Sequence, residues 1–244
     1  MPYDAVYPLG SGSKWNNNEL RYSLRSLEKN LVDLRNVYIV GYRPEWLTGA
    51  IHIPCDDPLP HNKDGNIIRK ILRACQTPGL SEDFLQVSDD QILLRPLSFA
   101  ELYPYYVVDL AGVDESWFSR GAWGKRMERT YQWLRAHGRT TYHYDSHIPL
   151  PMSKSQCVRV MSECDYEEGI GYGINTLYFN SIDLLEHQPI RDRRAVFEMS
   201  CRSTAAIRRR LYGKTYLNYF DPALTDGFKR AMAELFPDKS RFEQ

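Results

Sequence analysis

The sequence predicts an α/β fold in which a mixed, mostly parallel sheet is flanked by helices, with a helical C-terminal part. Short apolar segments such as residues 36–40 have the character of fully buried strands, and they alternate with segments whose apolar residues recur at helical spacing. Strands buried on both faces are typical of parallel sheets. With 244 residues and 43% hydrophobic content, the chain can bury the core of one such domain.

Composition argues against several classes of protein. The 31 basic and 31 acidic residues give a formal net charge of zero, so a contact with nucleic acid or an anionic membrane would need a local patch. The 5 cysteines include no Cys-x-x-Cys, which argues for a reducing compartment and against a zinc ribbon. No apolar run of about 18 residues and no secretory leader is present. We therefore expect a cytoplasmic protein without a transmembrane segment.

The first predicted strand, residues 3–7, runs into a Gly/Ser loop at residues 8–13. A strand, a flexible loop and a following helix present free backbone N–H groups to a phosphate, although the loop matches neither a dinucleotide fingerprint nor a Walker loop. The helix is predicted to begin near residues 16–19, where asparagine and glutamate favour a first turn. Arg21 and Arg25 lie four residues apart, so they could reach one anionic group together or lie solvated.

Two further strands are predicted at residues 36–40 and 50–54, followed by a long polar loop at residues 56–65 that contains Lys63. A helix is predicted over residues 66–76, ended by Pro78 and Gly79. Loops that leave the carboxyl ends of parallel strands are where open α/β sheets bind their ligands. The polar loop is therefore a candidate part of a binding site.

Residues 84–97 place Asp89 and Asp90 between two apolar runs. Two aspartates held on stiff, buried segments suit a hard divalent cation that takes carboxylate oxygens and leaves room for phosphate oxygens. Aspartate is also a good turn former, so a solvated turn is the alternative interpretation of the same residues.

Later segments hold one histidine-rich stretch and several basic helices. A strand is predicted at residues 105–110, and helices at residues 116–136, 174–185, 202–212 and 222–236. Residues 142–154 contain His143, Asp145, His147 and Lys154 in a proline-punctuated stretch that is not expected to be regular helix. A histidine near a carboxylate can act as a base at neutral pH, and it can also be purely structural.

Several of these segments together resemble the Stealth family, which comprises bacterial capsular polysaccharide phosphotransferases and the catalytic part of the animal GlcNAc-1-phosphotransferase. The resemblance is carried by residues 18–29 (NELRYSLRSLEK), 35–40 (RNVYIV), 44–47 (PEWL), 78–81 (PGLS) and 84–85, and by Asp89-Asp90 with residues 94–97 (LRPL). Residues 147–149 (HIP) and 236–243 (FPDKSRFE) are similar to later motifs of the family.

The resemblance implies a GT-A-like, Rossmann-type catalytic domain that transfers a sugar-1-phosphate from a nucleotide sugar to a hydroxyl acceptor. It implies that Asp89 and Asp90 hold Mg²⁺ or Mn²⁺ at the donor phosphate, that Asp90 also takes part in catalysis, and that His147 is the base for the acceptor hydroxyl. The donor, with a UDP-sugar most expected, would be bound near the first strand. Its candidate contacts are Tyr7, Gly10, Ser11, Glu19, Arg21, Arg25, Lys63 and Lys154.

The chain departs from the family where its first block would carry an acidic or amide residue, because residues 7–12 read YPLGSG. Glycosyl transfer, with attack at the anomeric carbon, is therefore an alternative to sugar-1-phosphate transfer. A phage-type enzyme that glycosylates a hydroxylated DNA base and an inactive sugar-nucleotide-binding module are two further alternatives. We expect a single domain, with residues 1–112 on the nucleotide-sugar side and residues 113–244 on the acceptor side.

Overall fold

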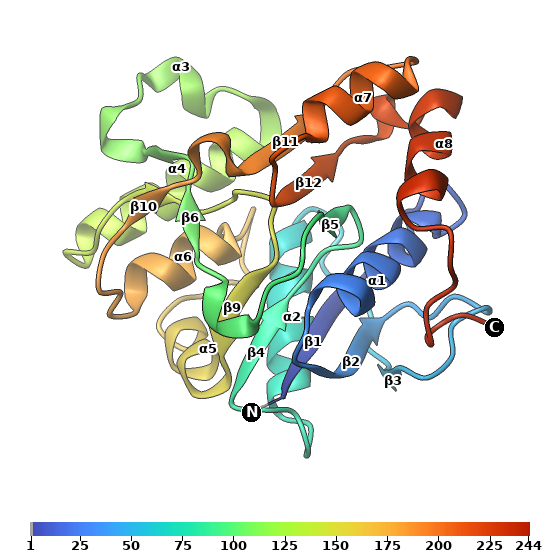
Figure 1. Ribbon diagram of the computed structural model, residues 1–244. Helices are drawn as coiled ribbons and strands as arrows, with labels where there is room; N and C mark the ends of the chain where they lie inside the picture. The colour runs from blue at the N-terminus through green and yellow to red at the C-terminus, as the bar shows by residue number, and fades with distance from the viewer. Residues whose placement is uncertain (1) are drawn as a thin grey trace.

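The computed structural model describes residues 2–244 and is built on a five-stranded sheet with helices on both faces (Figure 1). The strand order is β3-β2-β1-β4-β9, where the strands are β1 (Tyr3–Leu9), β2 (Leu34–Gly41), β3 (Ile51–Ile53), β4 (Asp83–Gln86) and β9 (Leu150–Ser153). The first four strands run parallel, and β9 is antiparallel to β4. The predicted mixed, mostly parallel sheet is confirmed.

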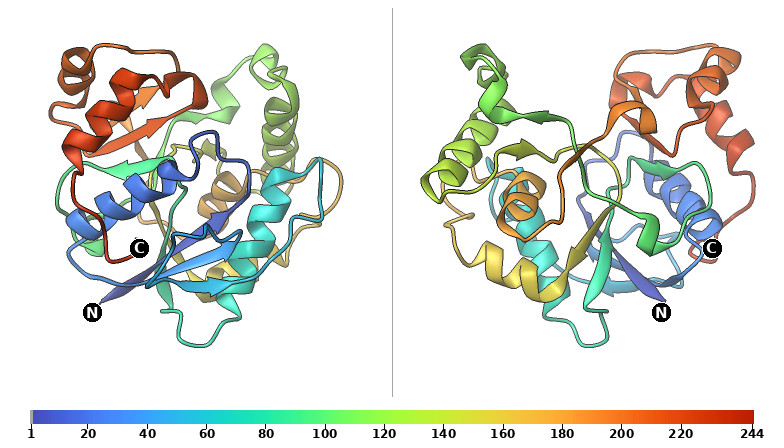
Figure 2. Two further views of the ribbon diagram at one scale, coloured as in Figure 1. Left: turned by 90° about the vertical axis from the view of Figure 1, so that its right-hand side faces the viewer. Right: turned by 60° about the vertical axis from the view of Figure 1, so that its left-hand side comes forward.

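Helix α1 (Asn18–Asn30) covers one face of this sheet, and α2 (Lys63–Cys75), α5 (Lys154–Met161) and α6 (Ile174–Ser181) pack together on the other (Figure 2). Leu20, Leu24 and Leu27 form the buried stripe of α1, as their spacing predicted. The start of α1 differs in one detail. Asn17 adopts a left-handed conformation and its side chain caps no N–H group, and the Asn18 side chain donates to the Trp15 carbonyl.

The C-terminal part contains a second, three-stranded sheet in addition to the predicted helices. Its order is β11-β12-β5, formed by β5 (Gln91–Leu93), β11 (Arg194–Phe197) and β12 (Tyr216–Tyr219), and α7 (Thr204–Leu211) and α8 (Asp226–Leu235) enclose a core with it. The sequence predicted both helices but neither β11 nor β12. These strands are four residues long and lack a strong alternating pattern, so they are defined by their pairing rather than by local sequence.

Several further elements complete the chain. They are β6 (Tyr105–Tyr106), β7 (Val108–Asp109), α3 (Glu115–Phe118), α4 (Gly121–Ala136), β8 (Tyr142–His143) and β10 (Gln188–Pro189), with four short 3-10 turns. The strand predicted at residues 105–110 is thus two short strands, and the helix predicted at residues 116–136 is interrupted before Gly121, which has a positive φ of 64°. The helix predicted to reach residue 185 ends at Ser181.

The main hydrophobic core lies between the five-stranded sheet and its helices. It joins early residues such as Val6 and Ile39 with later ones such as Leu134, Tyr144 and Leu177, so the N-terminal strands and the middle of the chain share one core. Within residues 2–244, none of the helices is long and apolar enough to cross a membrane.

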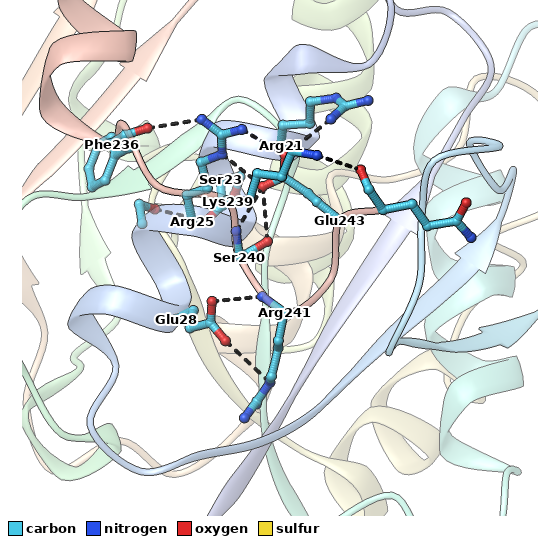
Figure 3. Close-up of polar contacts among 11 residues, drawn as sticks. Arg21, Ser23, Arg25, Glu28, Phe236, Lys239, Ser240, Arg241 and Glu243 are labelled. Carbon is cyan, nitrogen blue, oxygen red and sulfur yellow. Dashed lines mark hydrogen bonds and ion pairs between the residues drawn. The ribbon is translucent and has the colours of Figure 1, made fainter.

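The C-terminal segment is fastened to α1 through the buried carboxylate of Glu243 (Figure 3). Arg25 donates to both oxygens of Glu243, with Nε and Nη2 each at 2.7 Å, and Arg21 Nη1 donates at 3.1 Å. The Ser240 N–H and hydroxyl donate to the same carboxylate at 3.0 and 3.1 Å. Burial alone would raise the pKa of Glu243, but the hydrogen bonds from Arg25 and Ser240 lower it to about 2.

Glu243→Ala is expected to lower the free energy of unfolding by about 3 kcal/mol, because it leaves two arginines facing a buried site without a counter-charge. Urea unfolding followed by circular dichroism measures this change. The matched control is Glu234→Ala, which breaks an exposed ion pair with Arg208 and should cost less than about 0.5 kcal/mol. Equal costs for the two substitutions would contradict a fastening role for Glu243.

Candidate functional site

A cleft of about 970 Å³ opens at the carboxyl ends of the parallel strands. Its walls come from the loop after β1, the loop between β3 and α2, the segment after β4, the start of α6, and strand β11. Helices α3 and α4 lie on one side of the carboxyl ends of the strands, and helices α7 and α8 lie on the other side (Figure 2). This is the position at which open α/β sheets bind ligands.

Asp89 and Asp90 lie in this cleft where the chain passes from one sheet to the other. Strand β4 of the five-stranded sheet ends at Gln86, and β5 of the three-stranded sheet begins at Gln91. Asp90 Oδ2 accepts a hydrogen bond of 2.8 Å from Asn218 Nδ2 on β12. Residues 89–90 therefore form a turn, as one interpretation predicted, but their carboxylates face a cleft and a neighbouring strand.

The electrostatics of the pair are unfavourable for two negative charges. Burial and the nearby charges of Asp90 and Glu19 raise the pKa of Asp89 to about 7, and burial raises the pKa of Asp90. In the part of the chain that the structure describes, neither carboxylate has a Lys, Arg or His nitrogen within 4.0 Å. A bound cation would relieve this repulsion.

A divalent ion fits these residues only if a ligand completes its coordination. Across residues 2–244, no group of three or more His, Cys, Asp or Glu side chains is arranged to hold a metal. Mg²⁺ characteristically uses one or two carboxylates together with substrate phosphates and water. Asp89 and Asp90 match that donor set, because two carboxylates leave coordination positions for phosphate oxygens.

Three of the predicted donor contacts line the same cleft. Gly10 and Ser11 follow the end of β1, and Lys63 is the first residue of α2. The positive charge of Lys63 acts to lower the pKa of both Asp89 and Asp90. The structure thus brings a flexible Gly/Ser loop, a lysine and two carboxylates to one edge of the sheet.

Two other predicted contacts lie near the cleft without lining it. Tyr7 is 1% exposed, and its hydroxyl is hydrogen-bonded to Ser23 Oγ at 2.9 Å inside the core. The Glu19 carboxylate accepts a hydrogen bond of 2.7 Å from Ser13 Oγ and so closes the loop before α1. Glu19 therefore supports the loop and Tyr7 ties β1 to α1, so both side chains are engaged within the protein.

The predicted basic contacts Arg21, Arg25 and Lys154 are elsewhere. The two arginines do share one anionic group, but that group is the chain's own Glu243. Lys154 follows β9, which runs antiparallel to β4, so it lies at the opposite edge of the sheet from Asp89 and Asp90. There its backbone N–H binds the Glu82 carbonyl at 2.7 Å.

His147 faces the partly buried carboxylate of Asp145 in the cleft. Its Nε2 lies 3.7 Å from Asp145 Oδ1, and Trp123 Nε1 donates to Asp145 Oδ2 at 3.2 Å. Burial acts to raise the pKa of Asp145, but the charges of His147 and His143 and the Trp123 hydrogen bond together hold it below its usual value. His147 has a left-handed φ of 49°, a strained conformation of the kind that is often found at functional sites.

Two residues that sequence reasoning missed complete the site. Asn218 binds Asp90, and Arg194 on β11 donates to the Ser146 carbonyl, beside His147. Burial lowers the pKa of Arg194, and among the described residues it has no carboxylate partner within 4.0 Å. Both belong to short strands without a recognisable motif, so only strand pairing places Arg194 in the cleft wall and the fully buried Asn218 against Asp90.

A second histidine, His143, is enclosed in the cleft wall. It is 3% exposed, packs against Trp117 and Trp123, and its Nδ1 lies 3.2 Å from Thr176 Oγ1. Burial lowers the pKa of His143 to about 4. The imidazole is therefore neutral at physiological pH, and it forms part of the wall.

The His143 resonance is expected to titrate with a pKa of about 4 in an NMR pH titration, with His143→Gln used for assignment. Because this pKa is depressed, protonation of the unfolded state should cost the folded protein stability as pH falls from about 6.5 toward 4. A midpoint near 6.5 would show that the ring is solvated and that the wall is open.

Comparison with known proteins gives one sequence relative. No family model matches the chain. An exopolysaccharide phosphotransferase of Streptomyces coelicolor is 36% identical over 92 residues, which is 33% of this chain and 15% of that protein. The likeness to polysaccharide phosphotransferases that the motifs indicated is thus confirmed for part of the chain, which spans a small fraction of the relative's length.

Two solved structures resemble the whole chain at low sequence identity. The apo form of the glycosyltransferase GlyE of Streptococcus pneumoniae TIGR4 is 10% identical with a TM-score of 0.42, covering 97% of this chain and 64% of that one. An active-site mutant of LgtC is 12% identical with a TM-score of 0.49, covering 99% and 98%.

Proposed function

We propose that this protein is a transferase that moves a sugar-1-phosphate, or a sugar, from a nucleotide sugar to a hydroxyl acceptor. The observation that carries the proposal is the placement of Asp89 and Asp90 in one cleft, between a Gly/Ser loop with Lys63 and the His147–Asp145 pair. Such a cleft offers groups for a phosphate-bearing donor and a base for a nucleophile. The partial likeness to a phosphotransferase supports it.

The donor, which we propose to be a UDP-sugar, lies on the side formed by residues 1–112. The backbone N–H groups of Gly10 and Ser11 and the ammonium of Lys63 face its phosphates, because these are the positively polarised groups of that wall. Asp89 and Asp90 would hold Mg²⁺ or Mn²⁺ against the same phosphates. The ion supplies stabilisation of the negative charge that develops on the phosphate oxygens.

The acceptor approaches from the side formed by residues 113–244, where His147 is the base. With its Nε2 turned toward Asp145, His147 has Nδ1 left to accept the proton of the acceptor hydroxyl. Asp145 stabilises the imidazolium that results, in the manner of other oriented histidine bases. Trp123 fixes Asp145 through its indole N–H, so the base is held in place before the acceptor arrives.

The bond that breaks is identified by the nucleotide that is released. Attack at phosphorus transfers a sugar-1-phosphate and releases a nucleoside monophosphate, whereas attack at the anomeric carbon releases a nucleoside diphosphate. Incubation with a panel of nucleotide sugars in Mg²⁺ or Mn²⁺, followed by chromatography of the nucleotide, separates the two. The phosphotransferase relative leads us to expect the monophosphate. Release of neither product from any member of the panel would overturn the proposal.

Asp89→Asn and Asp90→Asn should each lower turnover at least about a hundredfold, because a metal clamp supplies several kcal/mol of stabilisation to the transition state. Each substitution keeps the side-chain shape, and circular dichroism checks that the fold is intact. Asp56→Asn is the matched control, since Asp56 is exposed and does not line the cleft. Wild-type rates in both variants would exclude the role assigned to the pair.

His147→Ala is expected to lower kcat about 10²- to 10⁴-fold and to remove the acidic limb of the pH–rate profile. His137→Ala, at an exposed position outside the cleft, should leave both unchanged. An unaltered pH profile in the His147 variant would assign the base to another group.

Two other functions have less support. Basic residues that could form a DNA groove are engaged within the chain: Arg126 pairs with Asp64 at 3.1 Å, and Arg208 pairs with Glu234 at 2.6 Å. A DNA-modifying enzyme would show strongly salt-dependent binding to duplex DNA. An inactive binding module would bind the nucleotide sugar without releasing any nucleotide.

A further inference from the structure

Helix α2 holds the preceding loop through polar side chains spaced four residues apart. Asn62 accepts a hydrogen bond of 2.7 Å from the Gly65 N–H at the start of the helix. One turn later, the buried side chain of Asn66 accepts from the Leu59 N–H at 3.1 Å and donates to the Leu59 carbonyl at 2.9 Å. These hydrogen bonds fix the position of the loop between β3 and α2.

Lys70, one further turn along α2, joins this loop to the end of β1. It is 2% exposed, and its Nζ donates to the Leu9 carbonyl at 2.9 Å and lies 2.6 Å from Asp57 Oδ1. A buried ammonium is costly unless it is paired, so the lysine fixes the position of its carboxylate partner. Asp57 is thereby held at the cleft wall.

The second oxygen of Asp57 faces the cleft beside the Gly/Ser loop. The Asp57 side chain is 44% exposed, and its Oδ2 lies 3.9 Å from the place where a Cβ on Gly10 would stand. A carboxylate repels phosphate, so this wall suits a neutral group with O–H donors. Lys63, by contrast, provides positive charge for phosphates elsewhere in the same cleft.

We propose that Asp57, positioned by Lys70, accepts hydrogen bonds from the ribose hydroxyls of the donor nucleoside. The inference rests on the proposed function and deepens it, because it names the residue that recognises the ribose of the donor. Acidic side chains that follow a strand in other nucleotide-binding α/β folds recognise ribose by the same chemistry. The phosphates then extend from the ribose past Gly10 toward Asp89 and Asp90.

The test is a set of binding measurements by isothermal titration calorimetry on the full chain, with Mg²⁺ present. UDP, GDP, CDP and ADP are each compared with their 2′-deoxy and 3′-deoxy counterparts. At least one ribonucleotide should bind roughly tenfold to a hundredfold more tightly than one of its deoxy forms, which is the effect of losing a hydrogen bond to a charged group. This preference should fall severalfold or more in Asp57→Asn, whose neutral amide oxygen is a weaker acceptor than a carboxylate, and should persist in Asp56→Asn.

Each other outcome counts against the inference in a distinct way. Nucleotide binding without a preference for ribose, or a preference that Asp57→Asn leaves intact, overturns the role of Asp57 and leaves the transferase proposal standing. Failure of all the diphosphates to bind overturns both. Thermal unfolding of Asp57→Asn, which alters a half-exposed side chain, verifies that any loss of binding does not come from loss of the fold.

Discussion

The passage of the chain from one sheet to the other at residues 87–90 is the constraint on which the site depends. Because β4 belongs to the five-stranded sheet and β5 to the three-stranded sheet, the aspartates between them lie at the junction of the two cores. The hydrogen bond from Asn218 ties Asp90 to the second sheet. The turn is thus anchored in both sheets. Burial and the neighbouring carboxylate raise the pKa of Asp89 to about 7, an unfavourable arrangement of charge that a bound cation would relieve.

The two sides of the cleft are built differently, and each is rigid for its own reason. The wall that we propose binds the donor is held by side chains of α2 that bind the loop before it, ending in the buried Lys70. The wall that we propose faces the acceptor is held by the turn around His147, which Trp123 and Arg194 fix through Asp145 and the Ser146 carbonyl. Preorganised groups of this kind reduce the rearrangement that a reaction requires. The C-terminal segment is held against α1 by the ion pair between Glu243 and Arg25.

Much of the architecture follows from local sequence, whereas the partners and positions of individual polar residues do not. Hydrophobic spacing predicted α1 and the parallel strands, and the turn-forming character of aspartate made a turn at Asp89-Asp90 one of the two interpretations of that pair. The spacing of Arg21 and Arg25 also predicted a shared anion, but their partner Glu243 is 218 residues from Arg25 in the sequence, and no local pattern reveals it. Lys154 lies at the opposite end of the strands from Asp89 and Asp90, because the direction of β9 depends on tertiary pairing. Asn218 is likewise placed only by the pairing of β12 with β5.

The central claim is that Asp89 and Asp90 hold a divalent ion jointly with the donor's phosphates. Electron paramagnetic resonance of Mn²⁺, titrated with the protein in the presence and absence of UDP, tests it most directly. Two carboxylates alone form an incomplete site, so we predict weak Mn²⁺ binding without the nucleotide, much tighter binding with it, and loss of the tight binding in Asp89→Asn and Asp90→Asn. Mn²⁺ binding that is indifferent to UDP, or that survives both substitutions, would contradict the claim.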